Sequence, residues 1–186
     1  MKFEIPSIAE IYDYLTHMAY EIRNKNINID VIVGIARGGL IPARFLSDLL
    51  LIPKIEIISA GFYTSVGKRM DKPIIYTNIG DEYRGKNVLL VDDVADTGET
   101  LEAVRRKLLE KGAVKVYTAV IYIKPWNKAK IDFYARKTDA WIIFPWEFIE
   151  TVHQLLKMDG VEHFKNIVKR DDKLRDIINK FVGDIV

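Results

Sequence analysis

The sequence predicts an α/β fold built on a doubly wound, mainly parallel sheet. Short apolar runs rich in β-branched residues occur at residues 31–35, 88–91 and 116–123, as expected of strands that are buried on both faces. Helical patterns lie between such runs, and this alternation favours parallel strands joined by helices. In sheets of this kind, ligands bind beyond the carboxyl ends of the strands.

The first part of the chain alternates helix and strand. Ser7 and Glu10 form a capping box that opens a helix reaching about Lys25. A strand at residues 31–35 then leads through a Gly-Gly turn into a helix with Pro42 near its start. Residues 55–59 form the next predicted strand. The first helix carries one apolar stripe, which comprises Ile8, Ile11, Leu15, Met18, Ala19 and Ile22.

An irregular segment separates these elements from the second half of the predicted sheet. Residues 61–72 (GFYTSVGKRMDK) have no periodicity and mix glycine, serine and basic residues, so we expect a mobile loop. Strands are predicted at residues 74–79, 88–92 and 116–123. A helix at residues 99–111, closed by Gly112, joins the last two strands.

The last third of the chain has a different character. All three tryptophans, Trp126, Trp141 and Trp146, lie close together in the sequence, with Phe144 among them. Residues 147–186 have a helical pattern, and near the end an apolar stripe follows helical spacing. That stripe comprises Leu174, Ile177, Ile178, Phe181 and Val182.

The composition indicates a soluble globular protein. A net charge of +2 argues against nucleic acid or an anionic membrane as the main partner. The absence of cysteine excludes disulfides and thiolate metal sites. The N-terminus lacks the apolar segment of a signal peptide and no apolar run approaches spanning length, so we expect a cytoplasmic protein.

Residues 88–100, VLLVDDVADTGET, carry most of the functional information. A buried strand ends in Asp92 and Asp93, and a short turn then opens a helix, whose first N–H groups favour an anion. Thr97 and Thr100 add hydroxyl donors, while the carboxylates suit sugar hydroxyls or Mg²⁺. These features indicate a phosphoribosyl site. The alternative is an ordinary strand that runs into a capped helix.

This segment resembles the phosphoribosyl-pyrophosphate (PRPP) motif of the type I phosphoribosyltransferases. The resemblance implies that Asp92 and Asp93 hold the ribose and Mg²⁺, and that Asp96 is the general acid/base. The remaining motif residues would contact PRPP: Val94, Ala95, Thr97, Gly98, Glu99 and Thr100. Glu99 occupies a variable position of the motif, and its charge must point away from the phosphate.

Two further segments resemble loops of the same family. Ala36, Arg37, Gly38 and Gly39 follow a strand and resemble the pyrophosphate loop, in which a non-proline cis peptide is expected between Ala36 and Arg37. Residues 61–72 resemble the flexible catalytic loop, so that Tyr63, Lys68 and Arg69 would close over the pyrophosphate and exclude water. Family members that act on 6-oxopurines often have Ser-Tyr near the loop start, whereas this chain has Phe62-Tyr63.

Segments around Lys124 and Trp141 resemble the bacterial xanthine-guanine phosphoribosyltransferases. Lys124 follows a strand and can donate to an exocyclic oxygen of a purine, and Trp141 offers a face for stacking. The backbone carbonyl of Ile142 is a candidate acceptor from the base. The alternative is that the tryptophans are core residues and Lys124 is a solvated lysine.

The resemblance predicts a purine salvage enzyme with Mg²⁺ as cofactor, PRPP and a 6-oxopurine as substrates, and a homodimeric or homotetrameric state. The predicted domains are a core at residues 1–149, including a small hood at 124–147, and a helical C-terminal extension at 150–186. The stripe of this extension would pack on the hood, form a subunit interface or cover the base site. Two other functions stay open: an adenine phosphoribosyltransferase and a non-catalytic regulator of transcription that binds PRPP or nucleotides.

Overall fold

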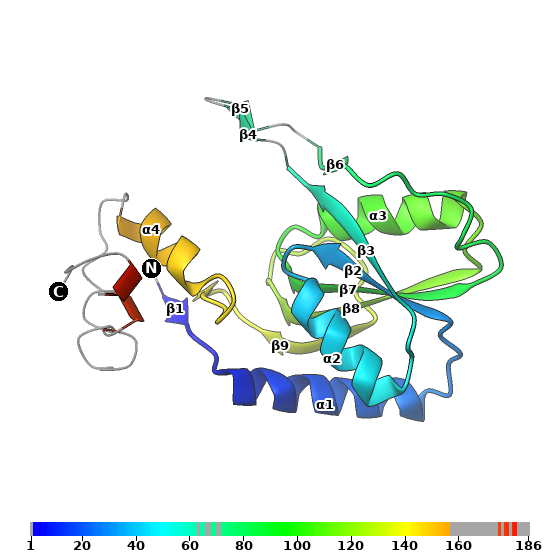
Figure 1. Ribbon diagram of the computed structural model, residues 1–186, viewed down its shortest axis with the longest axis horizontal. Coiled ribbons are helices and arrows are strands. Elements are labelled where there is room, and N and C mark those ends of the chain that lie inside the picture. Colours follow the sequence, from blue (N-terminus) through cyan, green and yellow to red (C-terminus); the bar gives the residue numbers. More distant parts are fainter. Residues whose placement is uncertain are drawn as a thin grey trace. The chain divides into compact units, whose positions relative to one another are not determined.

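The structure is a computed structural model that describes residues 2–62, 64–65, 68–69, 72–156, 175, 177–178 and 180–181 (Figure 1). Contacts divide the chain into two compact units. The larger unit is Ile11–Thr138, and the smaller one combines Met1–Glu10 with Asp139–Val186. The expected domain boundary between residues 149 and 150 stays a prediction.

The larger unit contains a six-stranded sheet with the order β6-β3-β2-β7-β8-β9. All neighbours are parallel except β3 and β6, which are antiparallel. The predicted mainly parallel α/β sheet is therefore confirmed. The strands are β2 (Val31–Ala36), β3 (Ile55–Gly61), β6 (Ile74–Ile75), β7 (Asn87–Ala95), β8 (Lys115–Ile123) and β9 (Phe133–Lys137).

Helices cover both faces of this sheet (Figure 1). They are α1 (Ile8–Asn24), α2 (Leu40–Leu50) and α3 (Glu99–Glu110). The predicted capping box of α1 is confirmed, because the Glu10 N–H donates to Ser7 Oγ at 3.2 Å and the Ser7 N–H donates to Glu10 Oε2 at 2.8 Å. Five of the six residues of its predicted stripe are buried, whereas Ile8 is 49% exposed.

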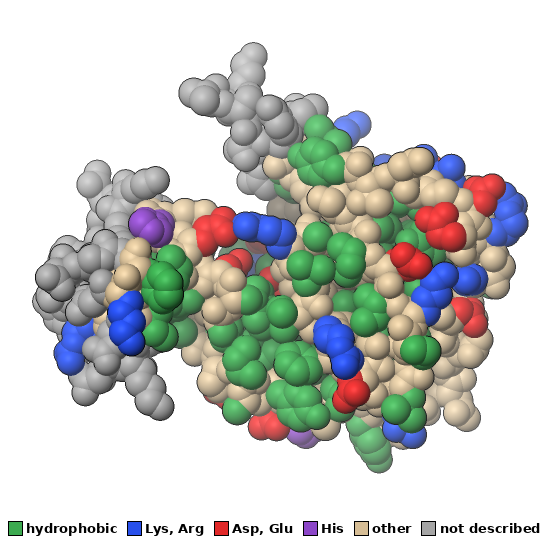
Figure 2. Space-filling model, viewed as in Figure 1, with side chains coloured by type: hydrophobic (Ala, Val, Ile, Leu, Met, Phe, Trp, Pro, Cys, Tyr) green, Lys and Arg blue, Asp and Glu red, His purple; other side chains and the backbone are tan. Residues whose placement is uncertain are grey.

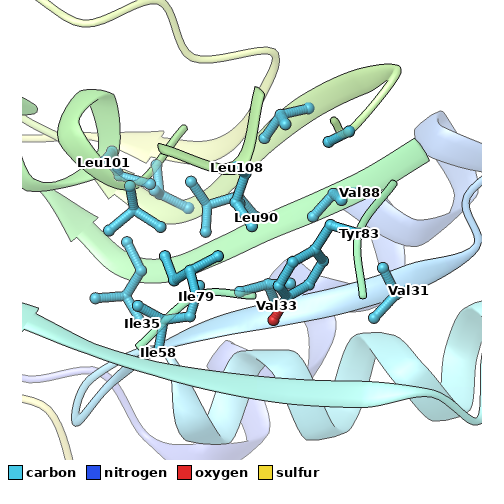
Figure 3. Packing of buried hydrophobic residues seen from close by; sticks show 14 of the residues in the cluster. Val31, Val33, Ile35, Ile58, Ile79, Tyr83, Val88, Leu90, Leu101 and Leu108 are labelled. Carbon is cyan, nitrogen blue, oxygen red and sulfur yellow. The ribbon is translucent and has the colours of Figure 1, made fainter. Parts of the chain in front are cut away.

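The two faces of the central strands pack against different helices. On one face, Val33 and Leu90 belong to a core shared with Leu108 of α3 (Figure 3). On the other face, Gly34 makes room for α2, since a Cβ on Gly34 would stand 3.1 Å from Ala43 Cβ. Side chains alternate along a strand, so each central strand is buried on both faces, which is why these strands read as continuous apolar runs.

The structure corrects the predictions for the middle of the chain. The strand predicted at residues 74–79 is only two residues long, because the Ser59 N–H is bound by the Thr77 hydroxyl at 2.8 Å rather than by a strand partner. Ile79 is buried in the core with α3 instead. Where an irregular loop was expected, β4 (Thr64–Ser65) and β5 (Lys68–Arg69) pair antiparallel. Strand β9 was missed, since only Phe133 of its five residues is buried.

The smaller unit has a short parallel pair and a helix. Strands β1 (Phe3–Glu4) and β10 (Trp141–Ile142), neither of them predicted, pair with Phe3 opposite Trp141. Helix α4 (Phe148–Leu156) contributes to a small core. Ile178, from the predicted C-terminal stripe, is buried in that core, whereas Ile177 and Phe181 are exposed. The core comprises Ile143, Phe148, Val152, Leu155 and Ile178.

Charged side chains of both signs are interspersed among the described residues on the face shown in Figure 2. In the part of the chain that the structure describes, no helix has the length and apolar character needed to cross a bilayer.

Adjacent leucines of α3 give a matched test of the core between α3 and the sheet. Leu108 is fully buried, whereas Leu109 is 37% exposed. We expect Leu108→Ala to lower the free energy of unfolding by about 2–5 kcal/mol, because it leaves a cavity. Leu109→Ala should lower it by about 1 kcal/mol or less. Equal losses in denaturant-induced unfolding would contradict this packing.

Candidate active site

The turn between β2 and α2 lies at the carboxyl end of the sheet. The peptide bond between Ala36 and Arg37 is cis, as the sequence predicted. The Gly39 N–H donates to the Ile35 carbonyl at 2.8 Å, and the Ala43 N–H donates to the Gly39 carbonyl at 3.0 Å. Arg37 is thereby held in a tight turn that joins a buried strand to a helix.

Both glycines of this turn are required for space. A Cβ on Gly38 would collide with the Asp93 carboxylate, and one on Gly39 would collide with the Val91 carbonyl oxygen. The described positive-φ glycines are elsewhere in the chain, so neither position demands a left-handed backbone. The sequence suggested that these glycines let the backbone approach an anion. The structure adds a second cause, which is the close approach of β7 to the turn.

Asp92 and Asp93 lie side by side where β7 reaches this turn. Asp93 is only 6% exposed, and its backbone N–H donates to Asp92 Oδ1 at 3.0 Å. Burial raises the pKa of Asp92 well above its ordinary value, and the neighbouring Asp93 carboxylate raises that pKa further. Bringing both carboxylates to the ionised form is therefore costly until a cation or other hydrogen-bond donors arrive.

A cavity of about 170 Å³ lies beyond β7 and over the start of α3. Gly98 precedes α3 with φ 84° and ψ 0°, a left-handed conformation that favours glycine. The Glu99 N–H donates to Thr97 Oγ1 at 3.4 Å. The first N–H groups of a helix have no intrahelical acceptors and attract anions, so this wall of the cavity suits a phosphate. The cavity is lined by Phe62, Asp92, Val94, Ala95, Asp96, Thr97, Gly98, Glu99, Thr100 and Leu101.

Most of the predicted PRPP-binding residues of residues 92–100 line this one cavity. The exception is Asp93, whose carboxylate lies against Gly38 of the neighbouring turn. Phe62 and Leu101 were not predicted. The only signal for Phe62 was its place in the expected catalytic loop, beside Tyr63.

The segment after β8 adjoins the cavity. Lys124 is 9% exposed and its N–H donates to the Ala95 carbonyl at 3.0 Å. Two residues later, the indole Nε1–H of Trp126 donates to Asp96 Oδ1 at 2.7 Å. In the sequence Trp126 stands out only as a member of an aromatic cluster, so this contact was not predicted. Its one signal was its position directly after a strand that ends at the binding edge of the sheet.

The other predicted site residues are distributed over both units. Trp141, which is 43% exposed, and Ile142 lie in β10 of the smaller unit. Lys68 and Arg69 form β5, while Tyr63 lies outside the described residues. The purine site expected from Lys124, Trp141 and Ile142 therefore stays a prediction, as do the roles of Tyr63, Lys68 and Arg69.

Within the described residues, no group of three or more Asp, Glu, His or Cys side chains could enclose a metal ion. The acidic pair nevertheless fits Mg²⁺, which usually takes one or two carboxylates and completes its shell with water and substrate phosphates. The raised pKa of Asp92 is in keeping with this, because a divalent cation would relieve the repulsion between the two carboxylates.

Asp92→Asn tests the cost of the acidic pair. Below about pH 3, Asp92 is protonated in folded and unfolded chains alike and costs nothing. As pH rises, the unfolded chain releases this proton before the folded chain does, so the wild type loses stability. We expect Asp92→Asn to raise Tm by several degrees near pH 7.5 and by much less near pH 3. Thermal unfolding of the ligand-free protein at both pH values measures this, and an equal shift at both would contradict it.

Comparison with known proteins agrees with this geometry. The family described as "Phosphoribosyl transferase domain" matches residues 4–151. The xanthine-guanine phosphoribosyltransferase of Nitratidesulfovibrio vulgaris is 35% identical over 118 residues, which cover 62% of this chain and 68% of that protein. The protein of the same name from Desulfotalea psychrophila is 33% identical over 118 residues, covering 62% and 69%.

Two solved structures are similar to this chain in sequence and fold. A purine phosphoribosyltransferase from Pyrococcus horikoshii is 36% identical with a TM-score of 0.70, and the match covers 78% of this chain and 95% of that one. A hypothetical protein from Neisseria gonorrhoeae with bound ppGpp is 26% identical with a TM-score of 0.70, covering 91% and 98%. The family model matches most of the chain, and the strand, acidic pair and glycine turn of the motif are present in the structure. This chain therefore belongs to the phosphoribosyltransferase family.

Proposed function

We propose that this protein transfers the 5-phosphoribosyl group of PRPP to N9 of a 6-oxopurine, giving a nucleoside 5′-monophosphate and pyrophosphate. The main supporting observation is the hydrogen bond from the backbone N–H of Lys124 to the Ala95 carbonyl, at 3.0 Å. This bond connects Lys124, whose ammonium group is suited to an exocyclic oxygen of a purine, to the loop between β7 and α3 that lines the cavity. The names of the xanthine-guanine and purine relatives support the same substrate class.

PRPP would bind across the carboxyl ends of β2 and β7. The 5′-phosphate would take the wall formed by Thr97, Gly98 and Thr100, where the start of α3 and two hydroxyls offer donors. The ribose hydroxyls would be held by Asp92 and Asp93. The pyrophosphate would lie at the turn of Arg37, whose guanidinium can bind phosphate oxygens in bidentate fashion.

The reaction breaks the bond between C1′ and the pyrophosphate oxygen and forms the bond between C1′ and purine N9. Positive charge develops on the ribose as pyrophosphate departs, so the main requirement is to stabilise the leaving group. We propose that Arg37, Lys68 and Arg69 do so. Bound Mg²⁺, held by Asp92 and Asp93 with substrate oxygens, would neutralise further charge on the pyrophosphate.

Asp96 is the proposed acid/base residue. Its carboxylate would take the proton from purine N7 as the bond at N9 forms, so that the product leaves neutral at the ring. Lys124 would donate to the exocyclic oxygen at C6, Trp141 would stack on the ring and the Ile142 carbonyl would accept from the base. We also propose a homodimer or homotetramer, on the basis of the family resemblance.

The first test is pyrophosphate release with PRPP and Mg²⁺ against hypoxanthine, guanine, xanthine, adenine, uracil and orotate. We expect turnover with 6-oxopurines, and a fall of about a hundredfold or more in kcat for Asp96→Asn, because the proton acceptor is lost. Asp81→Asn is the matched control, since Asp81 pairs with Arg84 at 3.1 Å on an exposed turn. Turnover with adenine alone would overturn the proposed role of Lys124.

Lys124→Met tests recognition of the base. The substitution keeps the side chain length and the backbone bond to Ala95 but removes the ammonium group. We expect KM for the 6-oxopurine to rise by about tenfold or more, since a hydrogen bond from a charged donor is lost, and KM for PRPP to change little. Lys111→Met, at the far end of α3, is the control. A rise in KM for PRPP, with KM for the 6-oxopurine unchanged, would argue against a base-binding lysine.

A second candidate function is a nucleotide-binding regulator without transferase activity. The observation in its favour is the match to the Neisseria gonorrhoeae protein, whose structure contains ppGpp. This candidate predicts tight binding of a nucleotide, measured by calorimetry, together with no turnover of any base in the panel.

A further inference from the structure

Three successive residues of the cavity loop are bonded by one segment. In residues 124–128, here named the bracing segment, the Lys124 N–H donates to the Ala95 carbonyl at 3.0 Å and the Lys128 N–H donates to the Thr97 carbonyl at 3.1 Å. Between these backbone bonds, Trp126 Nε1–H donates to Asp96 Oδ1 at 2.7 Å. The bracing segment and the loop are 30 residues apart in sequence at this contact, so only the pairing of β7 with β8 brings them together.

The three bonds act on different parts of the loop. The two backbone bonds fix the course of the main chain on either side of residue 96. Of these three bonds, only the one from Trp126 is made to the Asp96 side chain. Its distance of 2.7 Å is at the short end for N–H to O, as expected of a donor to a charged carboxylate. The terminal torsion of an aspartate is broad, so an exposed carboxylate with no such donor would sample many orientations.

We propose that Trp126 is the positioning residue of Asp96. By binding Oδ1, the indole fixes the carboxylate plane and leaves the second oxygen to accept the proton from the base. This inference rests on the proposed function, because it assigns Trp126 a role that acts only through Asp96. It adds a residue to the reaction that the phosphoribosyl motif itself does not contain.

The indole is itself held in place although Trp126 is 50% exposed. The Lys124 ammonium lies 5.7 Å from the centroid of the Trp126 ring, within range of a cation–π interaction. A tight turn follows, in which the Asn127 N–H donates to the Lys124 carbonyl at 3.0 Å and the Asn127 side-chain amide donates to the Ala129 carbonyl at 2.7 Å. The lysine proposed to bind the base thus contacts the ring that orients the acid/base carboxylate.

Trp126→Phe removes the N–H donor and keeps an aromatic ring beside Lys124. We expect kcat with a 6-oxopurine to fall about tenfold, the effect of losing one hydrogen bond to a charged group, while KM for both substrates stays within about twofold. Trp146→Phe makes the same chemical change where the indole stacks on Phe144, with centroids 4.8 Å apart, and should leave kcat unchanged. A rise in KM with kcat retained would overturn the positioning role.

A double-mutant cycle shows whether Trp126 acts through Asp96. In an Asp96→Ala background the carboxylate is gone, so Trp126→Phe should lower kcat by less than about twofold further. A merely structural role would lower kcat by the same factor in both backgrounds, and that result would overturn the proposal.

The contact can also be tested without turnover. In protein labelled with ¹⁵N-tryptophan, the three indole N–H signals should include one that Trp126→Phe removes and Asp96→Ala shifts. An unmoved Trp126 signal would overturn the contact. A wild type that turns over no base would overturn the proposed function, and the positioning role with it. An active wild type with an unimpaired Trp126→Phe variant would overturn the positioning role alone.

Discussion

The site depends on the close approach between the turn after β2 and the end of β7. Parallel pairing of Gly34 with Val91 brings these two strand ends to the same edge of the sheet. The turn can pass only because Gly38 and Gly39 have no side chains, which leaves room for the Asp93 carboxylate and the Val91 carbonyl. An edge rich in charge is thus assembled at the ends of two strands whose central residues are apolar and buried.

This arrangement is electrostatically incomplete without a ligand. Asp92 loses water and faces Asp93, and both effects favour its neutral form. The fold tolerates the arrangement because the rest of β7 is well packed: Val88, Leu89, Leu90 and Val91 are all fully buried. The apolar core thus holds two carboxylates side by side at the end of β7 despite the electrostatic cost of ionising both.

Much of the fold could be predicted from the sequence because its central strands are buried on both faces and its helices are amphipathic. Elements near the edges were harder. In β9 only Phe133 is buried, and the two-residue strands β1 and β10 have no periodicity long enough to detect. The strand predicted at residues 74–79 was too long because Ile79 is apolar for a different reason, as a core residue under α3.

The candidate site also has a part that could be predicted from the sequence and a part that could not. Residues 92–100, which are contiguous in the motif, were found together, and all of them except Asp93 line one cavity. The contacts of Gly38 with Asp93 and of Trp126 with Asp96 join segments distant in sequence. No local pattern encodes such pairs, because they follow from the register of parallel strands. A lysine after a strand, such as Lys124, does not by itself indicate which loop it contacts. The pairing of β8 with β7 brings residues 124–128 to the loop at residues 95–97.

The packing around Gly98 couples two stretches of the chain that are distant in sequence. The space that a side chain at residue 98 would need is filled by Asn127 and Ala129, so the turn before α3 and the segment after β8 are fitted to each other. A change that moved Asn127 or Ala129 would therefore have to be matched by a change in that turn. Insertions and deletions in either stretch are constrained by the other.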